Sequence, residues 1–221
     1  MNPLITLSAT VLLTAIPTMS QPNHKPSYTI TESTSHHESW LRFEGAMTMK
    51  GMSDLGDKIV AGNYDRLELN SAGGLAQSGY LLGHAIEYSN VKVMVRYGDI
   101  CLSACAFAAM GSDDVIINGI LGLHSPYAMG HDSGTTLTEI AQISNVGFAD
   151  MMWYLSNMGY NIRLLKQIAD ETSPESFIVF SNAADLKSFK TDSFLNDTKE
   201  YMTMYEVMST DDIREYLQNK E

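Results

Sequence analysis

The chain has 221 residues, of which 44% are apolar and 18% are charged, as in an ordinary globular protein with one domain and a real core. Its formal net charge of −12 argues against a nucleic acid or an anionic membrane surface as partner, because nothing supplies a basic patch. Two cysteines are too few for a disulfide scaffold.

Residues 1–20 are predicted to be an export signal. Residues 4–16 form an uncharged apolar run, which is shorter than the roughly 20 residues of a membrane span. Pro17 ends the run, and residues 18–20 offer a small-x-small cleavage pattern. No Lys or Arg precedes the run, so only the α-amino group is positive there. We therefore expect an exported protein, periplasmic or secreted.

The next stretch, residues 21–39, is polar and rich in turn formers. It is predicted to be a polar linker or, alternatively, an early edge strand. His36 and His37 lie within it, but no further ligand follows at a spacing that suits a metal ion. We expect a solvated loop here and no metal site.

From residue 40 onward, strand and helix patterns alternate. Strand-like alternation is predicted for residues 40–45, 64–69, 91–97 and 114–118. Helical spacing of apolar residues, or a helix-favouring composition, is predicted for residues 49–61, 75–88 and 104–110. This rhythm predicts an α/β fold with parallel pairing and right-handed crossovers.

The second half of the chain reads as mostly helical. Residues 136–155 predict a long helix, residues 162–169 a second one, residues 177–180 a strand, and residues after Ser181 a short helix with a serine N-cap. Residues 196–221 are acidic and rich in Met and Tyr, which predicts a peripheral helical extension. We therefore expect one main domain over residues 40–195 and no second one.

Ser103 lies between the only two cysteines of the chain, Cys101 and Cys105. A strand-like run precedes it and a small-residue helix follows it, which is the layout of a nucleophile elbow. The flanking thiols could form a disulfide, which at this spacing needs a tight, irregular turn. Two small buried thiols are the alternative. The elbow predicts Ser103 as a nucleophile.

A serine nucleophile needs a base and an oxyanion site. His124 follows a strand and is the predicted general base, since no lysine occurs between residues 92 and 166 to form a Ser–Lys dyad. His131 lies in a loop and is the poorer candidate. Gly73, Gly74 and the backbone N–H of Ala104 are the predicted oxyanion donors. Such turns collect at the carboxyl ends of strands.

Together these motifs resemble the Clp protease proteolytic subunit and its periplasmic relatives in the ClpP/crotonase superfamily. The resemblance covers about residues 40–190 and rests on residues 70–74, 101–105 and 122–124. The family normally has proline where this chain has Ala72. The resemblance implies a spiral of repeated ββα units, a peptide or protein substrate, and no metal or cofactor. It also implies a homo-oligomer, and export leaves no ATPase partner expected.

The family also takes a carboxylate from the segment after the long helix, where it orients the imidazole. Glu175 is the first choice by resemblance. Asp170 and Glu171 are alternatives in the same segment, and Glu139 is a candidate outside it.

Three functions compete at this point. The leading hypothesis is an exported ClpP-like serine peptidase that acts through an acyl-enzyme. The second is a non-catalytic binding or scaffold protein that retains the fold. The third is a crotonase-type acyl-CoA enzyme, against which the export signal and the serine–histidine pair both count.

Overall fold

A computed structural model describes residues 27–34, 38–126, 136–190 and 205–219. The predicted export signal, His36, His37 and His131 lie outside the described residues. Within the described part of the chain, no helix combines the length and the apolar character needed to cross a bilayer.

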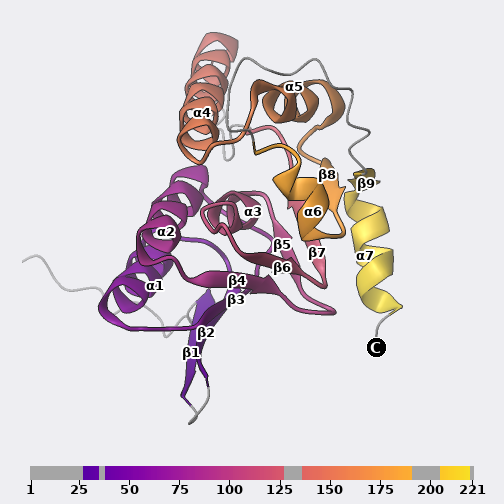
Figure 1. The fold of residues 1–221 in the computed structure, drawn as a ribbon. Helices are drawn as coiled ribbons and strands as arrows, with labels where there is room; N and C mark the ends of the chain where they lie inside the picture. The colour runs from indigo at the N-terminus through magenta and orange to yellow at the C-terminus, as the bar shows by residue number, and fades with distance from the viewer. Residues whose placement is uncertain (1–26, 35–37, 127–135, 191–204, 220–221) are drawn as a thin grey trace, which may run out of the picture.

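Two sheets form the centre of the molecule (Figure 1). The first has the strand order β1 (Tyr28–Thr34), β2 (Ser39–Gly45), β3 (Arg66–Asn70), β4 (Lys92–Val95) and β6 (Val115–Ile117). Strand β1 is antiparallel to β2, and the other neighbours are parallel. The second sheet has the order β5 (Ile100–Leu102), β7 (Ile120–Leu123), β8 (Ser176–Phe180) and β9 (Glu206–Ser209).

The chain repeatedly passes from the first sheet to the second and then into a helix. Strands β4 and β5 precede α3 (Ala104–Ala109), and β6 and β7 precede α4 (Leu137–Asn157). Strands β5 and β7 are parallel, whereas β8 and β9 are added antiparallel. This arrangement confirms the expected α/β fold of repeated ββα units.

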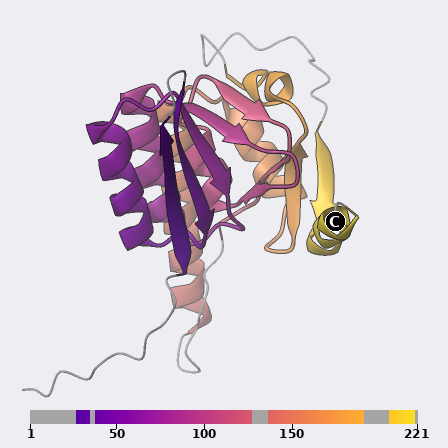
Figure 2. The same cartoon turned by 90° about the horizontal axis from the view of Figure 1, so that it is seen from below.

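Helices α1 (Met49–Ala61), α2 (Ala76–Ser89) and α3 cover one face of the first sheet, as Figure 2 shows from below. Alternate strand residues point toward them, because successive side chains of a strand face opposite sides. The main core forms between these layers and includes Leu41, Phe43, Leu67 and Val93, all fully buried. The turns that follow β3 and β5 are therefore anchored in a closely packed apolar layer.

Helices α4 and α5 (Ile162–Glu171) follow the second pair of strands. A capping box of Thr136 and Glu139 begins α4, and Asn161 caps α5. Only the second half of α4 enters the core, through Met151, Tyr154 and Leu155. The first half extends away from the two sheets (Figure 1). The short helix α6 (Ala183–Lys187) begins at Asn182, one residue after the serine we expected as its N-cap.

The domain is larger than the sequence predicts at both ends. Of the two alternatives for residues 21–39, a linker or an early edge strand, the structure has the edge strand over Tyr28–Thr34, which forms β1 by pairing with β2. At the other end, α7 (Thr210–Gln218) confirms the expected C-terminal helix, and the strand β9 before it pairs with β8 and joins the second sheet. Ile213 of α7 packs in a cluster with Leu102, Ile120, Phe177 and Val179.

Candidate active site

Ser103 stands at the junction of β5 and α3. Its backbone has φ 57° and ψ −124°, a conformation that only one other described non-glycine residue, Asn90, shares in the sign of φ. Its N–H donates to the carbonyl of Gly122 over 2.8 Å, and its own carbonyl accepts from the N–H of Phe107. Such a conformation costs of order 1–3 kcal/mol and persists only where the surroundings hold it. The turn has the sharp strand-to-helix geometry of a nucleophile elbow.

A disulfide joins Cys101 to Cys105, so the covalent loop has Ser103 at its centre. Both half-cystines are fully buried, whereas Ser103 is half-buried. Of the two alternatives that the sequence left open, the structure has the disulfide.

The glycine turn after β3 lies directly against Ser103. Gly73 has φ +101°, and a Cβ added to it would lie 2.7 Å from the Cβ of Ser103 and 3.2 Å from the backbone nitrogen of Ala104. Only glycine fits here, both for its backbone conformation and for the space. The Gly73 N–H donates to Ser71 Oγ over 3.0 Å, so this donor already has a partner.

Helix α2 begins directly after this turn, at Ala76, and Leu75 provides no side-chain cap. The free N–H groups of a helix N-terminus carry partial positive charge and favour a developing anion. The turn at Gly73 and Gly74 therefore places an electropositive helix end beside Ser103.

His124 follows β7, which pairs with β5 in the register Leu102 to Gly122. The two strand ends therefore bring Ser103 and His124 to the same edge of the second sheet. Nδ1 of His124 lies 2.7 Å from the backbone carbonyl of Ser125. Since a carbonyl oxygen only accepts, Nδ1 carries the proton and Nε2 keeps a lone pair. Burial lowers the pKa of His124 from 6.5, and the hydrogen bond to Ser125 opposes this shift in part.

Ser125 is itself held from the end of α5. Its N–H donates to Thr172 Oγ1 over 2.8 Å, and its hydroxyl donates to the carbonyl of Ile168 over 2.9 Å. Thr172 Oγ1 lies 2.5 Å from the same Ile168 carbonyl. This network fixes the carbonyl that orients the imidazole.

Phe177, at the start of β8, packs edge-on against the His124 ring, with 4.9 Å between centroids and an interplanar angle of 82°. The phenyl ring is buried and also joins the cluster around Ile213. An aromatic ring therefore covers part of the imidazole and excludes water from it, which accounts for the lowered pKa of His124.

Three of the four carboxylates considered for a third member make other contacts. Asp170 pairs with Lys166, Glu171 accepts from the Tyr205 hydroxyl, and Glu139 completes the α4 capping box. Glu175 is exposed, and its backbone carbonyl accepts from the N–H and the hydroxyl of Thr210. The structure thus does not bring Glu175, our first choice, to the imidazole.

Ser103 and His124 line one cleft of about 640 Å³ together with the glycine turn. Its walls come from the start of α2, the middle of α4 and the loop before β8. The apolar lining residues include Leu75, Pro126, Ile143, Val146 and Phe177. None of the described lining residues is Asp, Glu, Lys or Arg. The cleft suits an uncharged, mainly apolar ligand.

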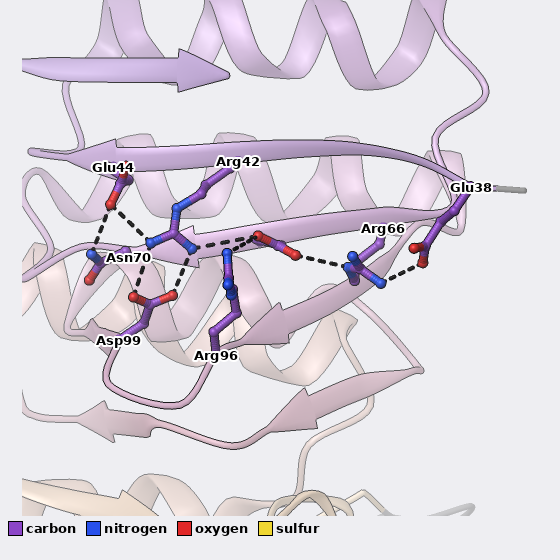
Figure 3. Close-up of polar contacts among 8 residues, drawn as sticks. Glu38, Arg42, Glu44, Arg66, Asn70, Arg96 and Asp99 are labelled. Carbon is purple, nitrogen blue, oxygen red and sulfur yellow. Dashed lines mark hydrogen bonds and ion pairs between the residues drawn. The ribbon is translucent and has the colours of Figure 1, made fainter. Parts of the chain in front are cut away.

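An ion-pair network on the first sheet connects Arg42 with Glu44, Glu68 and Asp99 (Figure 3). Arg42 donates to both carboxylate oxygens of Asp99, at 2.7 and 3.0 Å, and Asp99 directly precedes β5. Asn70, at the end of β3, accepts from the N–H of Ile100 and donates to Glu44. The network therefore ties the strand before the glycine turn to the strand before Ser103.

Comparison with solved structures identifies the same architecture. A point mutant of ClpP1 from Listeria monocytogenes superposes with a TM-score of 0.51 and 14% identity, over 68% of this chain and 86% of that one. The chain has a ClpP-like fold. A mutant of 1510-N, a membrane-bound stomatin-specific protease, matches with a TM-score of 0.47 and 15% identity over 67% of this chain and 74% of that one. No family model and no curated protein sequence matches the chain.

The sequence does not single out three residues that the structure places around His124: Ser125, Thr172 and Phe177. A backbone carbonyl as the partner of a histidine leaves no mark in the sequence, because every residue has one. Only the position of Ser125, next to the predicted base, could have pointed to it.

Proposed function

We propose that the chain is an exported serine peptidase of ClpP-like fold in which Ser103 attacks the scissile carbonyl and His124 is the general base. One observation carries the proposal. Ser103 is held at a positive φ at the end of β5, in the cleft that His124 and the glycine turn also line. Strain of this kind at a strand-to-helix turn presents a hydroxyl group to a substrate.

In the proposed mechanism, Nε2 of His124 accepts the proton of the Ser103 hydroxyl as its oxygen bonds to the substrate carbonyl. The N–H groups of Gly74 and Ala104 stabilise the negative charge of the tetrahedral oxygen, and the N-terminus of α2 adds to this field. His124 then gives the proton to the leaving amine as the C–N bond breaks. Water, deprotonated by the same nitrogen, hydrolyses the acyl-enzyme.

The tautomer of His124 supports this assignment. The Ser125 carbonyl accepts a hydrogen bond from Nδ1–H, which leaves Nε2 to act as the base.

The substrate we propose is an uncharged, apolar stretch of extended polypeptide. The cleft is lined by Leu75, Ile143 and Val146, and the described lining residues carry no formal charge except on a protonated His124. Burying a substrate carboxylate or ammonium group there would cost several kcal/mol without a partner. Acidic or basic residues next to the scissile bond should therefore be rejected.

Export and self-association belong to the same proposal. The apolar run of residues 4–16 supports export, and a disulfide persists in an oxidising compartment. The exposed side chains of Met152 and Trp153 on α4, which do not line the cleft, support a contact between copies of the chain. Sedimentation of the full chain tests the second point, and a purely monomeric protein at micromolar concentration contradicts it.

Hydrolysis of p-nitrophenyl acyl esters and of quenched peptides tests the peptidase. We expect an ester burst equal to the enzyme concentration, a covalent acyl adduct by intact mass, and loss of both in Ser103→Ala and His124→Ala. Turnover that persists in Ser103→Ala contradicts the assignment.

The contact of Phe177 with His124 favours one second candidate, a non-catalytic module that binds apolar peptides in the same cleft. In such a protein the ring of Phe177 only packs the imidazole. Saturable binding of an apolar peptide by wild type and Ser103→Ala alike, with no ester burst, would select this function.

A further inference from the structure

The disulfide and the proposed nucleophile form one covalent unit. Cys101 lies in the middle of β5, Cys105 lies in the first turn of α3, and the bond between them encloses Leu102, Ser103 and Ala104. The bond is buried below the turn, and Ser103 faces the cleft above it. No other described segment has a covalent constraint of this kind.

The bond spans a sharp reversal of the chain. The Cα atoms of Cys101 and Cys105 are 5.0 Å apart. Four residues advance about 6 Å along an α-helix and about 13 Å in a strand, so neither regular structure brings the two ends this close. The reversal occurs at Ser103, where φ is 57°. The disulfide therefore links the two residues that flank Ser103 two positions away on each side, and Ser103 itself has an unfavourable positive φ.

Hydrogen bonds also hold the turn. The N–H of Leu102 donates to the carbonyl of Ser71, and the N–H of Ser103 donates to the carbonyl of Gly122, which anchors the strand side. On the other side, α3 has only six residues, and the N–H of Phe107 reaches the Ser103 carbonyl at 3.2 Å. A short helix of this length adds little rigidity by itself. After reduction, only these hydrogen bonds and the contact with Gly73 would hold Ser103 at its positive φ.

We propose that the Cys101–Cys105 disulfide is the positioning element of Ser103, and that reduction of this bond by a dithiol slows the reaction of the nucleophile. This inference rests on the proposed function. In the reaction, one thiolate of the dithiol attacks a half-cystine and the second thiolate resolves the mixed disulfide. The protein gains two electrons and two protons as the two cysteine thiols, and the dithiol becomes a cyclic disulfide. Air oxidation of the two thiols restores the bond.

The test compares the full chain in its oxidised and reduced forms. Because both half-cystines are buried, reduction is carried out with excess dithiothreitol in mild denaturant, which is then removed under anaerobic conditions. Alkylation after a denaturing quench counts the thiols, and circular dichroism verifies that the reduced chain is folded. The readout is the rate at which a fluorophosphonate probe modifies Ser103.

Reduction should slow this reaction about tenfold or more, since small displacements of a reacting group have effects of this size. Reoxidation should restore it. The variant Cys101→Ala/Cys105→Ala should be slow and indifferent to dithiothreitol, which also controls for effects of the reagent on the probe. A reduced, folded chain that reacts within twofold of the oxidised chain overturns the inference.

Amide hydrogen exchange separates this inference from the proposed function. Reduction should speed exchange in residues 101–107 and leave α1 unchanged. If the oxidised chain does not react with the probe, the proposed function fails, and the exchange data still decide whether the disulfide holds the turn. Unchanged exchange in residues 101–107 contradicts the inference whatever the activity.

Discussion

The imidazole of His124 donates Nδ1–H to the backbone carbonyl of Ser125 over 2.7 Å. In a serine triad the third group selects the histidine tautomer and steadies the charged ring. The carbonyl of Ser125 does the first of these. This relationship leads to the first two predictions.

The reaction of Ser103 should depend on pH through His124 alone. The base must be neutral to accept a proton, so the rate of fluorophosphonate modification rises as pH rises through its pKa. Burial beside Phe177 lowers that pKa from 6.5, so the midpoint of the rate profile should lie below pH 6.5. A midpoint above pH 7 in the rate profile would contradict this environment of His124.

Thr172→Val should slow the same reaction while the protein stays folded. It removes the hydroxyl that accepts from the Ser125 N–H, and so loosens the carbonyl that orients the imidazole. A rate reduction of about tenfold is expected from misorientation of the base. Thr172→Ser retains the hydroxyl and should recover most of the rate. Equal rates of modification in the valine variant and wild type, with unchanged thermal unfolding, would show that Thr172 does not help to position His124.

Gly73→Ala should abolish modification of Ser103. Its Cβ would lie 2.7 Å from both the Ser103 Cβ and the Leu102 carbonyl oxygen, at φ +101°. Gly98→Ala is the matched control, because Gly98 has φ +84° and nothing within 4 Å of an added Cβ. It should cost about 1 kcal/mol of stability from the left-handed backbone alone. A comparable loss of reactivity in both variants would show that the contact between residue 73 and Ser103 is not the cause of the loss.

Arg42→Met should lower the free energy of unfolding by about 2 kcal/mol, because it leaves the Asp99 carboxylate poorly compensated. The side chains of Arg42 and Asp99 are 14% and 11% exposed, so some solvent screening reduces the cost from that of a fully buried pair. Lys50→Met breaks the exposed pair with Asp54 and should leave urea unfolding unchanged. Equal effects of the two substitutions would mean that the network in Figure 3 adds no stability.

Much of this architecture follows from the sequence because long elements carry periodic signals. The spacing of Met52, Leu55 and Ile59 predicts α1, and these residues are buried in the core. The glycine turn, Ser103 and His124 were expected at successive strand ends, and the structure places all of them on one cleft. Parallel strands end at a common edge, so this convergence needs no contact information.

Short strands, long-range strand pairing and the contacts of His124 have no periodic signal in the sequence. Strand β5 has three residues, too few for an alternating pattern, so the sequence did not separate it from β4. The pairing of β9 with β8 is a long-range contact that connects residues 206–209 with residues 176–179. The family resemblance predicts a carboxylate beside the imidazole of His124. In the structure, the ring of Phe177 and the carbonyl of Ser125 contact this imidazole.

Whether Ser103 is an activated nucleophile is decided by treating the oxidised, folded chain with a fluorophosphonate and locating the adduct by peptide mass mapping. We expect one adduct, on Ser103, that is absent in Ser103→Ala and His124→Ala and that forms at an unchanged rate in the surface variant Lys50→Met. An unmodified wild-type chain, or an adduct that persists in Ser103→Ala, would contradict the claim that Ser103 is an activated nucleophile.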